Sequence, residues 1–290
     1  MKKKIIRIIL EVLAVLIFLI YISPLILVVI NSAKTGSVIT TNPLSWPTNW
    51  GTLIDNVKAV LSSPTVQYGK SFLSSVIITV CSLILITVVS SVAAWAIVRR
   101  KTKGSNILYY MFVAAMVIPF QVVMYPLISW FKTITDTVTM PLFGFSLLRS
   151  YQGMIFAYLG FGISKAIFMF HGFVKGIPYE IEEAARIDGC NQFQVYTKII
   201  LPMLKPIIVT VVILNGIWIW NDFLLPLLIL GKGNAIQTLP LAVSNFVGAY
   251  VKQWDLILTS TLIAIVPVLI IFIFAQKQII RGMTEGAVKS

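Results

Sequence analysis

The chain has 290 residues, of which 58% are apolar and only 11% are charged, and this composition excludes an ordinary soluble domain. Its net charge of +13 does not indicate nucleic-acid binding, because most Lys and Arg residues stand at the ends of apolar runs rather than in a basic stripe interleaved with aromatics. One histidine and two cysteines are too few for a typical zinc site. The composition therefore favours a membrane protein.

Six apolar runs follow one another along the chain, and each is long enough to cross a hydrocarbon core of about 30 Å as a helix. They cover residues 8–30, 72–98, 107–130, 151–170, 207–230 and 257–275. None of them alternates apolar and polar residues as a strand of a membrane β-barrel does. The sequence therefore predicts an all-α membrane protein in which residues 1–290 form a single transmembrane domain with six transmembrane helices.

Proline recurs inside these runs, at Pro24, Pro119, Pro126, Pro226 and Pro267. In a membrane bundle the neighbouring groups satisfy the backbone atoms that proline frees, so these residues predict kinks. Kinked helices suit a pathway that opens and closes, but they also occur in rigid bundles, and both interpretations stay open.

The distribution of positive charge predicts the orientation. If the N-terminus is cytoplasmic, fifteen Lys and Arg residues fall in cytoplasmic segments, seven fall in outer segments, and Lys165 lies within the fourth span. An excess of positive charge marks the cytoplasmic side, so both termini are expected in the cytoplasm of a multi-pass protein of the plasma membrane. The long cytoplasmic segment is then residues 171–206, between the fourth and fifth spans.

This cytoplasmic segment carries the signals of two short helices with a turn between them. Pro178 suits the start of the first helix, and Asp188 with Gly189 ends it, since glycine accepts the left-handed conformation that follows a helix. Asn191 is expected to cap the second helix, with Gln194 three residues later in the spacing of a capping box.

On the first of these helices, Ile181, Ala184 and Ala185 are spaced to share one apolar face of mostly small residues. Small residues allow another surface to approach closely, so this face is a candidate docking surface. The alternative is an amphipathic turn that packs on the protein's own core, and the physical features alone leave both open.

The same segment contains a longer pattern. Glu183-Ala184-Ala185, then Gly189, then Ile199-x-Leu201-Pro202 match E-A-A-x3-G-x9-I-x-L-P without a gap, which resembles the signature loop of permease subunits in bacterial ABC importers. Other stretches resemble the carbohydrate-uptake branch of that family, and within it the smaller, second permease of maltose-type systems. They are residues 117–126, 220–226, 238–240 and 281–289.

The resemblance implies a transport subunit that is not itself an enzyme. Its first loop helix would be a cytoplasmic coupling helix that contacts a separate ATPase through Glu182, Glu183, Ala184, Ala185, Arg186, Asp188 and Gly189. Its partners would be a second related permease in a heterodimer, two copies of the ATPase, an extracytoplasmic solute-binding protein and membrane lipid. The cargo would be a sugar or small oligosaccharide. No cofactor is expected on this chain, which lacks a G-x-x-x-x-G-K-[ST] loop, so ATP and Mg²⁺ would bind the ATPase.

Polar residues inside the expected spans are candidates for a substrate pathway, since such residues are costly in a bilayer. They are Gln121, Asn215, Asn221 and Asp222, of which Asp222 would either line the pathway or bind a neighbouring helix. Two other functions remain as alternatives. An importer permease of the same family for a non-sugar solute is the main one, whereas a secondary carrier explains the spans but not the loop.

Overall fold

The computed structural model describes residues 2–64, 66–247 and 253–287, and these are almost entirely helical, which confirms the predicted all-α class. The chain divides into two compact units. Unit 1 comprises Met1–Ser71 and Leu239–Pro267, and unit 2 comprises Phe72–Thr238 and Val268–Ser290. Two helices, α4 (Tyr68–Arg100) and α15 (Trp254–Ala287), contribute residues to both units.

Unit 1 is built on the C-terminal end of a long helix. Its elements are α1 (Lys2–Ser32), α2 (Gly36–Thr41), α3 (Gly51–Ser62), α14 (Leu239–Val243), η3 (Ser244–Phe246) and the first part of α15. The last carbonyls of a helix have no partner within it. Here the Asn56 side-chain amide donates to the carbonyls of Ser32 at 2.9 Å and Lys34 at 3.1 Å, and the Thr259 hydroxyl donates to Ser32 at 3.3 Å. These bonds attach α3 and α15 to the end of α1.

Lys34 lies inside unit 1 with only 4% of its surface exposed. Its ammonium donates to the Asn31 side-chain oxygen at 3.0 Å and to the carbonyls of Asn42 and Pro43, each at 3.2 Å. All three donors of the ammonium are therefore used, as a buried lysine requires. Lys34 is one of the seven positive charges that the predicted topology places in outer segments, and in the structure it closes the loop after α1.

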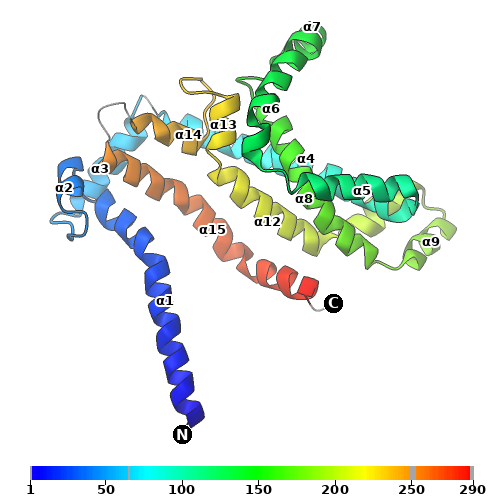
Figure 1. Ribbon diagram of the computed structural model, residues 1–290, viewed down its shortest axis with the longest axis horizontal. Helices are drawn as coiled ribbons and strands as arrows, with labels where there is room; N and C mark the ends of the chain where they lie inside the picture. The colour runs from blue at the N-terminus through cyan, green and yellow to red at the C-terminus, as the bar shows by residue number, and fades with distance from the viewer. Residues whose placement is uncertain (1, 65, 248–252, 288–290) are drawn as a thin grey trace. The chain divides into compact units, whose positions relative to one another are not determined.

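Unit 2 holds the remaining elements, with α8 packed against both α5 and α12 (Figure 1). In chain order after α4 they are α5 (Lys103–Ala115), α6 (Phe120–Ile134), η1 (Thr135–Thr139), α7 (Met140–Phe143), α8 (Tyr151–Lys175), α9 (Tyr179–Ile187), α10 (Gln192–Gln194), η2 (Val195–Ile200), α11 (Leu201–Met203), α12 (Lys205–Asn221) and α13 (Leu224–Ile229). Aromatic pairs join the helices. Tyr109 of α5 stacks on His171 of α8, with 3.8 Å between ring centroids.

Within the described residues, three single helices are long and apolar enough to cross a membrane: α1, α4 and α8. Two further candidates are bent pairs, Lys103–Ala115 with Phe120–Phe143 at 107° and Gln192–Met203 with Lys205–Asn221 at 72°, which bring the number to at most five. Trp254–Ile270 is a shorter apolar helix. The total of six spans therefore stays a prediction.

The uninterrupted helix expected over residues 107–130 is not found, because the chain breaks between α5 and α6 at Pro119. Proline disfavours the helical conformation of the residue before it and cannot donate to the preceding turn. Pro119 itself has extended backbone angles, φ −63° and ψ 137°, and precedes the first residue of α6. In contrast, Pro24, Pro126 and Pro267 lie inside α1, α6 and α15, which continue past them.

The helix expected over residues 207–230 is also divided. α12 ends at Asn221, Asp222 has the extended angles φ −73° and ψ 130°, and α13 begins at Leu224. The Asp222 carboxylate accepts a hydrogen bond of 3.0 Å from the backbone N–H of Leu224, the first residue of α13. The apolar run is therefore interrupted at Asp222, whose extended backbone ends α12.

One glycine near the start of α8 allows a close contact with the backbone that precedes the helix. A side-chain carbon on Gly153 would overlap the carbonyl group of Leu147, whereas one on Gly160 would meet no atom within 4 Å. We predict that Gly153→Ala lowers the free energy of unfolding by about 1–3 kcal/mol, the usual cost of overpacking. Gly160→Ala, on the same helix, should be neutral or stabilising by up to about 1 kcal/mol, since alanine is the better helix former. Thermal unfolding of the purified protein in detergent compares the two variants, and equal melting temperatures would contradict the prediction.

Candidate functional site

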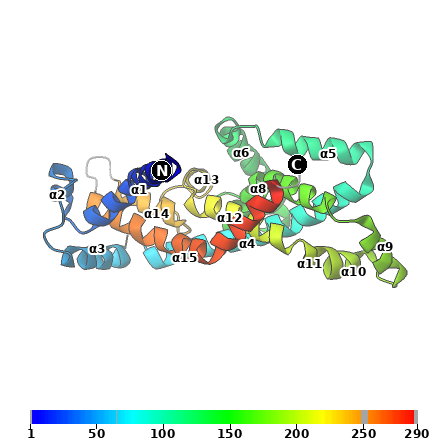
Figure 2. The ribbon, with the colours of Figure 1, turned by 90° about the horizontal axis from the view of Figure 1, so that it is seen from below.

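The segment after α8 folds into the two short helices that the sequence predicts, at one end of unit 2 (Figure 2). α9 ends in a left-handed glycine, Gly189, with φ +84°. The Cys190 N–H donates to the Ala185 carbonyl and the Gly189 N–H donates to the Arg186 carbonyl, both at 3.0 Å, which is the Schellman arrangement. Gly189 is therefore required by the turn, as the sequence indicates.

The second helical run begins with the predicted capping box. The Asn191 side chain accepts from the Gln194 N–H, and the Gln194 side chain accepts from the Asn191 N–H, each at 2.9 Å. The run then continues through η2 and α11 to Met203. Pro178 is the residue before α9 rather than its first helical residue, a difference of one position.

α9 has an inward and an outward face, and they are not the faces that the sequence suggests. Glu182 is fully buried and Ala185 is 7% exposed, so these two residues face inward. Ile181 and Ala184 are exposed, and Ile187 is 86% exposed. The expected grouping of Ala185 with Ile181 and Ala184 is wrong, because Ala185 lies at the margin of the buried face.

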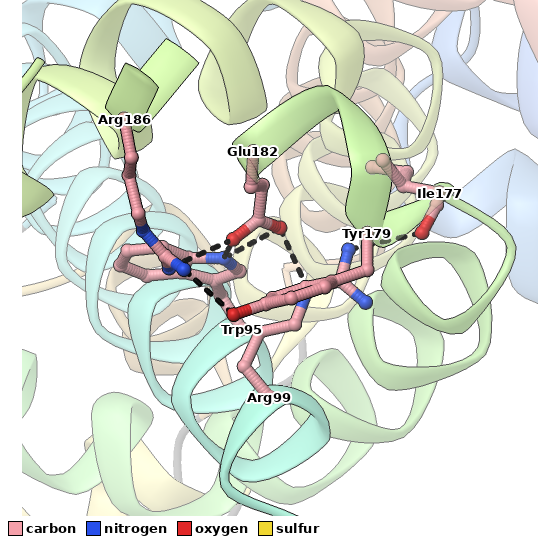
Figure 3. A network of polar contacts seen from close by, with 6 residues as sticks. All are labelled: Trp95, Arg99, Ile177, Tyr179, Glu182 and Arg186. Atoms are coloured by element: carbon pink, nitrogen blue, oxygen red, sulfur yellow. Dashed lines mark hydrogen bonds and ion pairs between the residues drawn. The ribbon is translucent and has the colours of Figure 1, made fainter. Parts of the chain in front are cut away.

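Figure 3 shows how the buried Glu182 carboxylate is bound. It accepts from Arg99 Nε of α4 at 2.6 Å and from Trp95 Nε1 of α4 at 3.1 and 3.2 Å. Arg186, one turn further along α9, lies 3.7 Å away. A carboxylate with no exposed surface is stable only when paired and hydrogen-bonded, and removing one partner of such a pair typically costs about 3–5 kcal/mol.

The Tyr179 ring adds to this network. The guanidinium carbons of Arg99 and Arg186 lie 5.7 and 5.4 Å from its centroid, within the range of cation–π attraction. Arg186 also donates to the Tyr179 hydroxyl at 2.6 Å, and Arg99 donates to the Ile177 carbonyl at 3.0 Å. Both guanidinium groups are therefore held against the start of α9.

A second attachment to α4 comes from η2. The Tyr196 hydroxyl lies 2.7 Å from the Ser91 hydroxyl, and its ring lies 5.4 Å from the Trp95 ring. We call the contacts of Ser91, Trp95 and Arg99 with Ile177, Glu182 and Tyr196 the α4–α9 joint.

The expected contact residues therefore separate into two groups. Glu182 and Arg186 take part in the internal network and Ala185 is buried beside them, whereas Glu183, Ala184, Asp188 and Gly189 are exposed. Sequence analysis missed Trp95, Arg99 and Tyr196. The basic cluster at residues 99–103 was an available signal for Arg99, but it was assigned entirely to membrane orientation.

The four polar residues proposed for a substrate pathway lie in different surroundings. Asn215 of α12 is fully buried; its amide nitrogen donates to the Val211 carbonyl at 2.9 Å, while its side-chain oxygen has no partner among the described residues. Asp222 accepts from the Tyr158 hydroxyl of α8 at 3.2 Å. Gln121 of α6 and Asn221 of α12 are exposed. Asp222 thus binds a neighbouring helix, one of the two roles considered for it.

Several known proteins are similar to this chain. Residues 86–285 match the family described as binding-protein-dependent transport system inner membrane component. The probable starch degradation products transport system permease protein AmyC of Thermoanaerobacterium thermosulfurigenes is 41% identical over 96% of this chain and 95% of its own. The multiple sugar-binding transport system permease protein MsmG of Streptococcus mutans is 36% identical over 92% and 91%.

A solved structure is similar in fold. A chain of a bacterial ABC transporter involved in the import of the acidic polysaccharide alginate superposes with a TM-score of 0.79, covering 95% of this chain and 97% of its own at 18% identity. With the match over residues 86–285 and the relatives aligned along nearly the whole length, the chain belongs to the family of inner membrane components of binding-protein-dependent transport systems.

Proposed function

We propose that this chain is the membrane-spanning permease subunit of an ATP-driven ABC importer that translocates a sugar or small oligosaccharide. The family supports the transport role, and the names of the relatives support the cargo: starch degradation products for AmyC, multiple sugars for MsmG, and arabinooligosaccharides for AraQ of Bacillus subtilis, which is 30% identical over 98% of this chain. The observation that supports the coupling role is the structure of α9. The inward face of this short helix binds α4, and its outward face exposes apolar side chains.

The outward face of α9 is the proposed docking surface for the ATPase. It consists of Ile181, Glu183, Ala184 and Ile187, followed by the exposed turn at Asp188 and Gly189. An isoleucine with 86% of its surface in solvent is unfavourable for the isolated chain and becomes favourable when a partner covers it. The partner would be a cytoplasmic ATPase that binds ATP and Mg²⁺, present in two copies.

The remaining proposals concern the assembly. Six spans with both termini in the cytoplasm fit the excess of fifteen inner over seven outer positive charges. A second related permease would complete the pathway as a heterodimer, and an extracytoplasmic binding protein would deliver the cargo. Binding of ATP and of the loaded receptor would each favour one of two states of the pathway. A non-sugar solute is the main alternative cargo.

The exposed Gln121 and Asn221 are the better candidates for contact with cargo. Gln121 exposes its amide group to a hydroxyl-rich ligand or a polar partner helix. Asn221 is exposed too, although its amide nitrogen donates to the Ile217 carbonyl at 2.8 Å, whereas Asp222 is engaged by Tyr158 and Leu224. Asn215 is buried within unit 2, so it belongs to the packing between helices in the state described here.

The first prediction from this proposal concerns transport. The chain, reconstituted in proteoliposomes with its partner permease, ATPase and binding protein, should accumulate radiolabelled oligosaccharide only when ATP is enclosed. A panel of maltose, maltotriose, arabinotriose and an amino acid separates the cargo classes. Uptake of the amino acid alone would favour the non-sugar importer, and sugar uptake driven by an ion gradient without ATP would favour the secondary carrier.

Docking gives a second prediction. Ile187→Asp places a charge on the centre of the outward face and should weaken association with the ATPase by at least about tenfold, since about 1.4 kcal/mol corresponds to that factor. Ile187→Leu keeps the apolar surface and serves as the matched control. Co-purification of the ATPase with the tagged permease measures the effect. Equal recovery with both variants would remove Ile187 from the docking surface.

The turn after α9 gives a third prediction. Gly189→Val introduces a β-branched residue at φ +84°, where strain of about 1–3 kcal/mol is expected. Gly189→Asn is the control, since asparagine tolerates the left-handed region. We expect sugar-stimulated ATP hydrolysis and uptake to fall with valine and to persist with asparagine. Normal transport by the valine variant would show that the turn is not required for coupling.

A further inference from the structure

Three side chains of α4 reach the segment that follows α8, and they recur at every fourth residue. Ser91, Trp95 and Arg99 therefore lie along one face of the helix. Ser91 bonds to Tyr196, while Trp95 and Arg99 bond to Glu182. Within the part of the chain that the structure describes, every recorded side-chain hydrogen bond or ion pair that leaves α9 ends on α4. This helix precedes α9 by about 80 residues, so the joint is entirely tertiary.

The connections of α9 to its neighbours in sequence are of a different kind. Only Gly176, Ile177 and Pro178 separate α8 from α9, and the chain bends by 72° between the α10–α11 run and α12. A short backbone linker allows rotation about its dihedral angles, whereas several simultaneous side-chain contacts fix an orientation. The side-chain bonds to α4 therefore constrain the orientation of α9, together with its packing on η2.

The other end of α4 in unit 2 is attached to different helices. There the Ser74 hydroxyl lies 2.8 Å from the Tyr151 hydroxyl of α8, and Phe72 packs edge-to-face on Trp220 of α12 at 5.8 Å. These contacts hold the start of α4 against the bundle. α4 is thus fixed at one end to α8 and α12 and at the other end to α9.

Between these two ends, α4 carries buried polar groups that are not satisfied. The hydroxyls of Ser82, Thr87 and Ser90 have no hydrogen-bond partner in the described part of the chain. The unpaired Asn215 oxygen of α12 lies near the same stretch, because a side-chain carbon on Gly162 would touch both Asn215 and Ile86. Unpaired buried groups are costly. A shift of the middle of α4 would therefore break no side-chain hydrogen bond of these groups.

We propose that α4 receives the motion of the ATPase directly, with α9 and the last turns of α4 moving as one rigid body through the α4–α9 joint. Residues Trp95, Arg99 and Glu182 are positioning residues in this scheme. The middle of α4 then shifts against α8 and α12, while its Ser74 end acts as the pivot. This inference rests on the proposed function, because it names the helix on which docking at α9 acts.

The first test measures distance while the α4–α9 joint is intact. Spin labels are placed at Arg100 and Glu180, both exposed, in a chain with Cys81→Ala and Cys190→Ala, and the full complex is reconstituted in nanodiscs. The separation is measured without nucleotide and with ATP bound to a hydrolysis-deficient ATPase. We expect the Arg100–Glu180 distance to stay constant within about 2 Å, the scale of small helix shifts. A reference pair, Glu180 and Lys205 of α12, should change by more.

The second test separates coupling from hydrolysis. With Glu182→Gln, sugar uptake per ATP hydrolysed should fall by at least about tenfold. Removing one partner of a buried ion pair shifts the equilibrium between the joined and separated states of α4 and α9 by more than that factor. Hydrolysis itself should persist. Glu180→Gln, on the exposed start of the same helix, is the matched control. If Glu182→Gln does not assemble, Tyr196→Phe removes only the hydroxyl that contacts Ser91 and should lower the same ratio to a smaller extent.

The outcomes distinguish this inference from the proposed function. Absence of uptake or of ATPase association in the native complex would overturn the proposed function. If the native complex transports sugar but the Arg100–Glu180 distance changes with ATP as much as that of the reference pair, the rigid-body inference is wrong. The same holds if Glu182→Gln and Tyr196→Phe both transport with native coupling.

Discussion

The arrangement of the 171–206 segment depends on one buried charge. Glu182 has no exposed surface, so its carboxylate must exchange water for protein donors, and Trp95 and Arg99 supply them. Once that pair is formed, the rotation of α9 about its own axis is determined. Glu183, Ala184 and Ile187 then face away from the protein, although nothing in their own side chains requires it. A single carboxylate thereby decides which residues of a nine-residue helix are available to another protein.

Sequence analysis succeeded where the determining interactions are short-range. The Gly189 turn and the Asn191–Gln194 capping box depend on residues within a few positions of each other, and both are present as predicted. The partner of Glu182 could not be found in this way, because Arg99 lies 83 residues earlier and basic residues near span ends have a sufficient explanation in membrane orientation. The error at Ala185 has the same cause: helical spacing shows which residues are neighbours, but not which face is buried.

The apolar runs illustrate a similar limit. Their composition correctly predicts helices, and α1, α4 and α8 have the length expected of spans. The breaks at Pro119 and Asp222 depend on backbone geometry and capping that hydropathy does not report. Lys34 was expected only as a positive charge of an outer segment, and the structure encloses it among carbonyl groups. In each case the charge or proline was noticed, and the missing information was its three-dimensional environment.

The two faces of α9 also separate two kinds of substitution. Substitutions at Ile181, Ala184 or Ile187 change the side chains that a partner meets and leave the network around Glu182 in place, because these residues take no part in it. Substitutions at Trp95 or Arg99 instead change the network that orients the helix and leave the composition of its outward face the same. Partner preference can therefore be redesigned at a few surface positions without rebuilding the interior of the permease.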